Sequence, residues 1–153
     1  MQHAFQISRK IEYGARAMVF LASLPEGMTT SFREIARKMD IPQEFLAKIL
    51  KTLVKAKLVK STRGARGGYS LALPPSKISL LDVIEAVEGP VGVNLCTEKE
   101  GACTFSMACT MNAVWALGQE RMLEVYRNAR LDRLAMRSLT HRSPVLSGAR
   151  PTA

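Results

Sequence analysis

The sequence predicts a mainly α-helical fold with a small β wing and a long helix near the C-terminus. Three observations support this class: two short helical patterns separated by a turn, a glycine-rich hairpin directly after them, and a final helical pattern over residues 110–130. With 153 residues, 47% of them hydrophobic, the chain can bury one ordinary core. We therefore expect one domain with an appendage.

The first helical pattern runs from about residue 8 to residue 24, and Pro25 ends it. Ser31 and Glu34 have the spacing of a capping box, which predicts the start of a second, short helix. A tight turn at Asp40-Ile41 is expected to end that helix. The next helical pattern begins directly after this turn. The sequence therefore predicts two helices joined by a short turn.

The third helix is predicted from residue 42 to about residue 55, with Pro42 in its first position, where a missing N–H costs nothing. On a wheel of roughly 100° per residue, one side of this helix is apolar. The predicted inner residues are Phe45, Leu46, Ile49, Leu50, Leu53 and Val54. The outer side has three lysines and one acid, which suits phosphate contacts, although a solvated face explains this helix equally well on its own.

Alternating residues at 57–61 and 69–73 predict two strands joined by a basic, glycine-rich tip, Arg63-Gly64-Ala65-Arg66-Gly67-Gly68. Two short helices, a turn and such a hairpin, in this order, are the winged helix-turn-helix pattern of DNA-binding proteins. The second of the two helices is expected to enter the major groove, and wing arginines can reach a minor groove or phosphates. The predicted DNA contacts are Ser31, Gln43, Lys48, Lys51, Thr52, Arg63 and Arg66.

The charge distribution favours a polyanionic partner such as double-stranded DNA. The net charge is +9, and residues 31–69 alone have ten basic and three acidic residues, a local charge of +7. Residues 79–102 have five acids and one lysine, a local charge of −4. The positive charge is therefore a patch over the predicted DNA-binding segment.

The three cysteines of the chain lie in one acidic loop, with the spacing Cys96-x6-Cys103-x5-Cys109. This is not the C-x2-C pair of a structural zinc site. Thiolates are the ligands that iron–sulfur clusters need. From spacing alone, a cluster, a zinc ion and a metal-free thiol switch are all compatible with the loop. A small redox enzyme is not expected, because no histidine lies near the cysteines in the sequence and no catalytic constellation is evident.

From about residue 7 to residue 135 the chain resembles the winged-helix bacterial regulators that include the iron–sulfur-assembly repressor IscR and the nitric-oxide-sensing repressor NsrR. Three motifs and the cysteine triplet support this resemblance most strongly. The motifs are Phe45-Leu46-Ala47-Lys48-Ile49-Leu50, Arg63-Gly64-Ala65-Arg66-Gly67-Gly68-Tyr69 and Glu88-Gly89-Pro90. The resemblance implies a dimeric transcriptional regulator, a repressor, without enzymatic activity.

The resemblance also implies that Cys96, Cys103 and Cys109 bind an iron–sulfur cluster of the 2Fe–2S or 4Fe–4S type, which would sense nitric oxide, iron or redox state. The first gap of six residues differs from the five more common in the family. Asn112 stands where the iron–sulfur-assembly repressors have a histidine ligand, and alignment of the N-terminal pattern gives Glu12 of the partner subunit as the fourth ligand.

The pattern at residues 110–130, with Thr110 as the expected N-cap, is the longest in the chain. A core helix would fit it, and the resemblance implies a dimer helix that places two recognition helices on a symmetric site. The predicted division is a DNA-binding domain at 1–90, a cysteine loop at 91–109, a dimerisation region at 110–137 and a disordered tail at 138–153. We expect no membrane segment or export signal, and hence a reducing cytoplasm.

Overall fold

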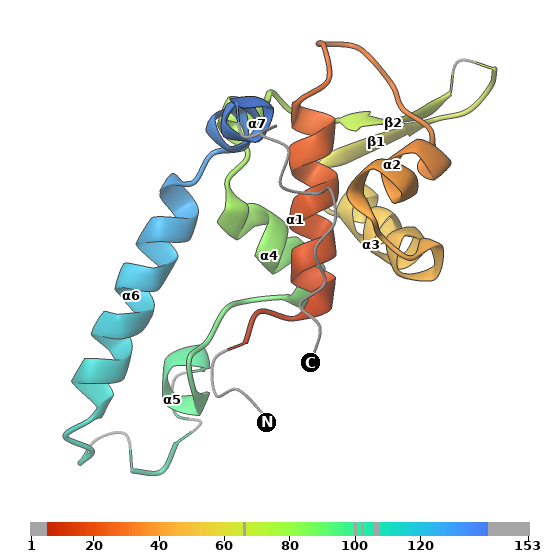
Figure 1. Cartoon of the computed structure of the whole chain (residues 1–153). Coiled ribbons are helices and arrows are strands. Elements are labelled where there is room, and N and C mark those ends of the chain that lie inside the picture. The colour runs from red at the N-terminus through yellow and green to blue at the C-terminus, as the bar shows by residue number, and fades with distance from the viewer. Residues whose placement is uncertain (1–5, 66, 100, 102, 106–107, 141–153) are drawn as a thin grey trace, which may run out of the picture.

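The computed structural model describes residues 6–140, except residues 66, 100, 102, 106 and 107. Helices dominate, and the two strands form one antiparallel hairpin (Figure 1). The elements are α1 (Arg9–Ala22), α2 (Phe32–Met39), α3 (Gln43–Lys55), β1 (Val59–Thr62), β2 (Gly68–Leu71), the 3-10 turn η1 (Pro75–Lys77), α4 (Leu80–Glu88), α5 (Leu95–Glu98), α6 (Asn112–Asn128) and α7 (Leu131–Thr140).

Helix α1 lies at the centre, with α2, α3 and the hairpin on one side and α4 on the other (Figure 1). Its N-cap is Ser8, whose side chain accepts a hydrogen bond from the Ile11 N–H at 3.2 Å. Gly14 is buried, and a Cβ there would lie 3.0 Å from the Val87 side chain, so glycine lets α1 approach α4 closely. The first turn of α1 is also tied to the last turn of α4, because Lys10 donates to the Val87 carbonyl and Ser8 donates to Glu88.

The helix-turn-helix forms as predicted, with three local differences. Ser31 accepts from the Glu34 N–H at 3.2 Å, but the Glu34 carboxylate pairs with Arg37 instead of completing the capping box. Pro42 is the N-cap of α3 and not its first residue. Phe45, predicted on the inner side, is 43% exposed, because it lies at the edge of the apolar face and packs edge-on against Tyr13.

The hairpin is shorter than predicted and shifted along the sequence. Strands β1 and β2 pair Val59 with Leu71 and Thr62 with Gly68. Residues 57 and 58 do not join the first strand, since Lys57 has a positive φ of 59° and closes the end of α3. Helix α4 begins with a capping box: the Ser79 N–H donates to Asp82 at 2.7 Å, and Ser79 accepts from the Asp82 N–H at 3.1 Å.

The helical pattern predicted over residues 110–130 forms one helix, α6, and a second helix that the sequence did not predict, α7, follows it. Met111, instead of Thr110, occupies the N-cap of α6, and the chain breaks after α6 before α7 begins. Leu131 and Ala135 of α7 are buried, and Leu131 belongs to the main core, so α7 returns to the DNA-binding half of the molecule. Helix α7 includes residues 138–140, which the sequence assigned to a disordered tail; residues 141–153 lie outside the described residues.

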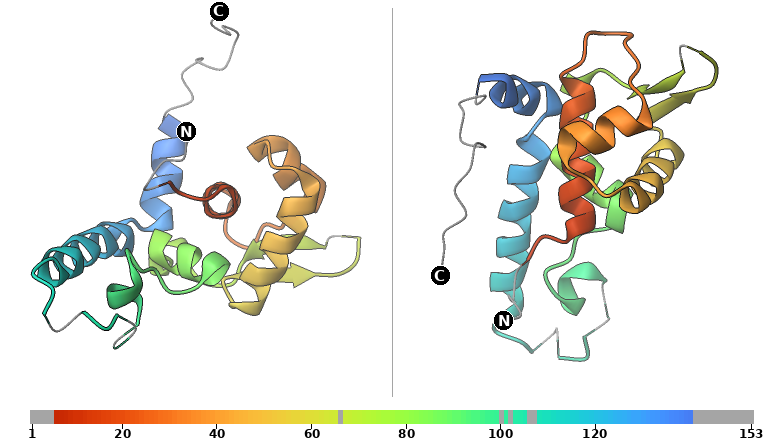
Figure 2. Two further views of the ribbon diagram at one scale, coloured as in Figure 1. Left: turned by 90° about the horizontal axis from the view of Figure 1, so that it is seen from below. Right: turned by 45° about the vertical axis from the view of Figure 1, so that its right-hand side comes forward.

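We call residues 89–111 the cysteine loop. It leaves the end of α4 and enters α6, which stands beside α4 and far from α2 and α3 (Figures 1 and 2). Helix α5, which includes Cys96, lies inside a segment predicted as continuous loop. Within the described residues, no helix is long and apolar enough to cross a membrane.

Candidate functional site

Helix α3 presents one buried face and one exposed face. Leu46, Ile49, Leu50 and Leu53 are almost completely buried and fix the rotation of the helix. Gln43, Lys48 and Lys51 are exposed, so the predicted contact residues lie on the side away from the core. This leaves two lysines and one amide free to approach a nucleic-acid groove.

The two hydroxyl groups predicted as DNA contacts already take part in local hydrogen bonds. Ser31 accepts from the Glu34 N–H, and the Thr52 hydroxyl donates to the Lys48 carbonyl at 3.0 Å. Ser31 can still donate its own proton to a phosphate, because its oxygen acts as the acceptor within the cap. Thr52 is half-buried and has its proton engaged, so it is the less available of the two.

The wing is anchored to the helix-turn-helix by a backbone bridge that the sequence did not predict. Thr30 and Tyr69 exchange two N–H···O bonds, of 3.0 Å and 2.8 Å. Gly68 makes this approach possible, since it has a φ of +147° and a Cβ there would lie 2.4 Å from the Thr30 oxygen. The exposed Arg63 is carried at the wing tip, and the predicted contact Arg66 lies outside the described residues.

Cys96, Cys103 and Cys109 are all free thiols and all half-buried. The structure does not gather them into one metal-binding group: within the described residues, no three His, Cys, Asp or Glu side chains are close enough to hold an ion. The donor chemistry nevertheless fits a cluster, because three unpaired thiols share one loop and thiolate is the required ligand. Asn112 lies in the first turn of α6, and His3 and His141 are outside the described residues.

Cys96 is held in a small hydrogen-bond network on α5. Its thiol donates to the Asn94 side-chain oxygen at 3.2 Å, and Asn94 and Thr97 cap the helix reciprocally. The segment is fixed to α6 by Gln119, which accepts from the Val93 N–H at 2.9 Å and donates to the Thr97 carbonyl at 3.1 Å. The Asn94-x-x-Thr97 spacing could have signalled α5 from the sequence, whereas nothing in the sequence marks Gln119.

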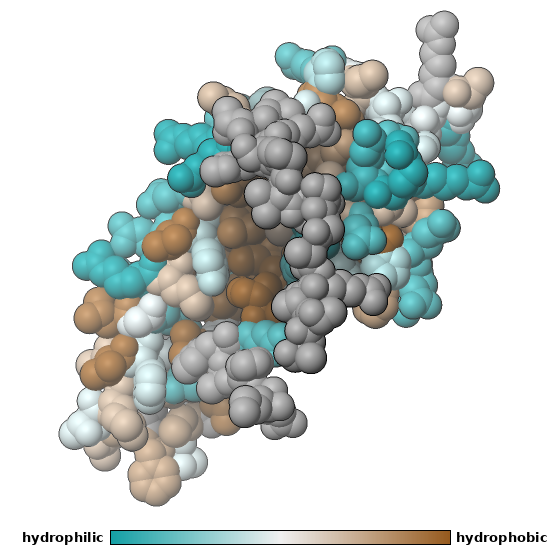
Figure 3. Space-filling view, viewed as in Figure 1, coloured by the Kyte–Doolittle hydropathy of each residue, from teal (hydrophilic) through white to brown (hydrophobic). Residues whose placement is uncertain are grey.

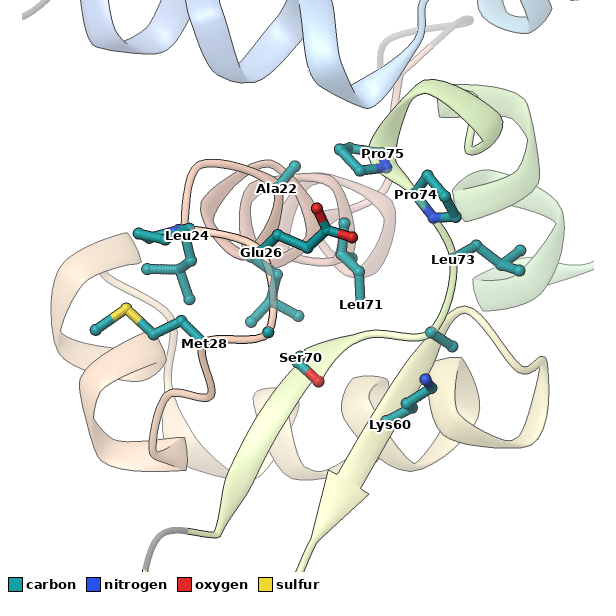
Figure 4. A pocket seen from close by; sticks show the side chains of 14 residues that line it. Ala22, Leu24, Glu26, Met28, Lys60, Ser70, Leu71, Leu73, Pro74 and Pro75 are labelled. Carbon is teal, nitrogen blue, oxygen red and sulfur yellow. The ribbon is translucent and has the colours of Figure 1, made fainter.

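A hollow of about 380 Å³ lies between α5 and α6, lined by Cys96, Gln119 and Arg127 among others. A second cavity, of about 470 Å³, lies between the end of α1 and the root of the wing. Figure 4 shows that most of the side chains that line it are apolar, with Glu26, Lys60 and Ser70 as the polar ones. It contains none of the predicted site residues, and we assign it no role.

Glu12 lies in the first turn of α1, on the side of the molecule where the cysteine loop begins. Its carboxylate pairs with Arg16 and, at 3.3 Å, with Arg9. Its side chain is 36% exposed and therefore reachable from outside the subunit. As a ligand, Glu12 would have to exchange these arginine contacts for iron.

Helix α6 has no buried residue along its whole length. Large apolar side chains are exposed on it, and Figure 3 shows hydrophobic side chains along the edge of the molecule that α6 forms. They include Val114, Trp115, Leu117 and Val125, of which Val114 is 63% exposed. Apolar surface of this extent is typical of an interaction face.

Helix α3 with its exposed lysines, the wing anchored to Thr30 and the basic patch over residues 31–69 define a winged-helix DNA-binding protein. Residues 7–137 match the Rrf2 family, described as an iron-dependent transcriptional regulator. The chain belongs to the Rrf2 family of transcriptional regulators. The predicted fold class and family resemblance are thereby confirmed.

The curated relatives match about half of the chain, whereas similar solved structures match most of it. The HTH-type transcriptional regulator Rv1287 of Mycobacterium tuberculosis is 42% identical over 86 residues, covering 56% of this chain and 53% of the relative. The chain thus spans about half the length of the curated relatives it matches. Two solved structures are similar over most of their length: CymR, the global cysteine regulator of B. subtilis (31% identity, 87% of this chain and 98% of that one, TM-score 0.72), and IscR of T. potens (28%, 91% and 93%, TM-score 0.72).

Proposed function

We propose that the protein is a dimeric regulator, a repressor, that binds double-stranded operator DNA with an affinity set by an iron–sulfur cluster in the cysteine loop. The observation that carries this proposal is the attachment of that loop. It holds three free thiols and connects α4, which packs under the DNA-binding core, to α6, which exposes an apolar face. A change in the loop can therefore reach both the DNA-binding domain and a dimer partner.

Cys96, Cys103 and Cys109 would hold the cluster, of the 2Fe–2S or 4Fe–4S type. When bound, a cluster supplies a centre that reacts with oxidants or nitric oxide or is lost when iron is scarce. The chain's own part is to present the three thiolates and to pass a rearrangement of the loop to α6. The distance between two recognition helices would then differ between the loop states, and with it the operator affinity.

The test is to purify the full-length protein anaerobically and to measure absorption, iron, acid-labile sulfide and zinc. We expect iron and sulfide in equal amounts, and loss of visible absorption in each Cys→Ala variant with an unchanged winged-helix circular dichroism spectrum. Operator binding should differ between the loaded and the metal-free protein. Stoichiometric zinc without sulfide would overturn the cluster.

A metal-free thiol switch is the second candidate. The free state of all three cysteines is compatible with it, and a structural relative is a global cysteine regulator. Anaerobic protein without iron or zinc, whose operator affinity changes on oxidation and returns on reduction, would favour this alternative.

The homodimer is supported by the exposed apolar face of α6. If a second copy covers this face, Val114→Asp should shift the protein toward monomer in analytical ultracentrifugation. Glu124→Ala, a change to an exposed polar residue of the same helix, serves as the control. A variant with Val114→Asp that stays fully dimeric would move the interface elsewhere.

Glu12 of the partner subunit is proposed as the fourth ligand. Its carboxylate lies in the first turn of α1 and is 36% exposed, which supports access from a second subunit. A mixed dimer of a Glu12→Ala chain and a Cys103→Ala chain tests it. If Glu12 acts across the interface, half of the cluster returns; if it acts within its own chain, both sites stay broken. A Glu12→Ala homodimer with a normal cluster would remove Glu12 from the ligand set.

A further inference from the structure

The side chain of Gln119 joins α6 to the segment that carries Cys96. Its oxygen accepts from the Val93 N–H and its nitrogen donates to the Thr97 carbonyl, so one amide holds both ends of the turn around Cys96. Among the described residues, these two are the hydrogen bonds between residues 93–98 and α6. The side chain is half-buried, which protects both bonds from exchange with water.

The Cys96 thiol takes part in the hydrogen bonds of the same turn. The thiol donates to the Asn94 side chain, and the Thr97 hydroxyl donates to Asn94 while accepting from its N–H. A sulfur that binds a metal has no proton to donate, so metal ligation of Cys96 removes the bond to Asn94. Asn94, the acceptor of this bond, is the N-cap of α5 and directly follows Val93.

We infer that Gln119 is a positioning residue that transmits the state of Cys96 to α6. This inference rests on the proposed sensor function. The path is short: Cys96 bonds to Asn94, Asn94 and Thr97 cap each other, and Gln119 binds the flanking Val93 and Thr97 groups. A rearrangement of this cap changes the direction of the two groups that Gln119 holds, and thereby the position of α6 relative to the loop.

Two substitutions separate the two hydrogen bonds. Gln119→Met has a similar length and removes both. Gln119→Glu, as a carboxylate, can still accept from Val93 but cannot donate to Thr97. Glu120→Ala is the matched control, because it changes the next residue of α6, which is exposed and whose side chain has no hydrogen bond or ion pair to the other described residues.

The first measurement uses the full-length, metal-free, reduced protein. In Gln119→Met we expect the Val93 amide to exchange with solvent about fivefold faster than in the wild type, as the loss of one ordinary hydrogen bond implies. We expect the alkylation of Cys96 by iodoacetamide to be faster by about the same factor. In Gln119→Glu the Val93 amide should stay within about twofold of the wild type, while Cys96 alkylation still rises. Glu120→Ala should change neither rate. Wild-type rates in Gln119→Met would overturn the inference.

The second measurement is the ratio of operator affinities of the loaded and metal-free protein. Gln119→Met should bring this ratio close to one while the metal-free affinity stays within about twofold of the wild type, since only the coupling between sites is lost. A wild-type ratio in Gln119→Met would refute the role of Gln119 and leave the sensor intact. If the wild-type protein itself has a ratio of one, the proposed function fails, and the exchange and alkylation rates still decide whether Gln119 holds the loop.

Discussion

The DNA-binding half and the cysteine half of this molecule differ in what fixes them. The first, which we call the DNA-binding domain, comprises residues 8–88 and α7, and its core contains fully buried side chains from α1, α2, α3, β1, α4 and α7. The second, the cysteine arm, comprises residues 89–129, and none of its described residues is buried. Packing determines the DNA-binding domain, whereas hydrogen bonds at a few points hold the arm. A region held in this way can change its conformation at low cost.

The largest contrast is expected between two leucines. Leu53 of α3 is fully buried, so Leu53→Ala leaves a cavity and should lower the free energy of unfolding by about 2–5 kcal/mol. Leu117 of α6 is 54% exposed, and Leu117→Ala should cost less than about 0.5 kcal/mol at dilutions where the protein is monomeric. Urea denaturation of both variants measures the difference. Equal losses would mean that the arm has a core of its own.

The next largest effect is expected at Gly68, beside the backbone bridge between the wing and Thr30. Gly68→Ala places a Cβ 2.4 Å from the Thr30 oxygen, at a φ that side chains rarely adopt. We expect it to lower stability by about 1–3 kcal/mol and to weaken DNA binding, because the wing loses its anchor. Calorimetry and fluorescence anisotropy with duplex DNA measure the two effects. Ser70→Ala on the same strand is the control, and an equal loss there would assign the effect to the strand as a whole.

The smallest effect is expected for a substitution on the DNA-binding surface that leaves the free energy of unfolding unchanged. Lys51 is exposed on α3, and Lys51→Ala should reduce the slope of log affinity against log salt by about 0.9. Lys77→Ala, at an exposed lysine of η1, should leave the slope unchanged. If both lysines alter the slope equally, the protein binds DNA through its overall charge instead of through α3.

Local sequence signals predicted α1, α2 and α3 of the DNA-binding domain. The cap at Ser31 and the apolar periodicity of α3 depend on neighbours within four residues, and these elements formed where expected. The break between α6 and α7 has no glycine or proline to mark it. It depends on distant partners, since the Ala129 carbonyl accepts from Leu80 and the Leu131 N–H donates to Ile78.

The functional sites show the same difference between what local sequence patterns predict and what depends on distant residues. Outward-facing lysines follow from helical periodicity, so Lys48 and Lys51 could be placed on the exposed side of α3 from the sequence alone. The wing bridge to Thr30 and the Gln119 contacts join residues far apart in the chain, and no local pattern encodes them. Three cysteines on one loop identify possible ligands, but their spacing cannot determine how the loop folds around them.

The backbone bridge between Ser79 and Arg130 has a consequence for how the chain can vary in length. It closes the intervening residues into a large loop whose two ends are both fixed on the DNA-binding domain. The entropy of closing a large loop depends on the logarithm of its length, so one inserted or deleted residue between α5 and α6 changes stability by well under about 0.1 kcal/mol. The gaps between the cysteines can therefore be lengthened or shortened by a residue while the DNA-binding domain keeps its stability.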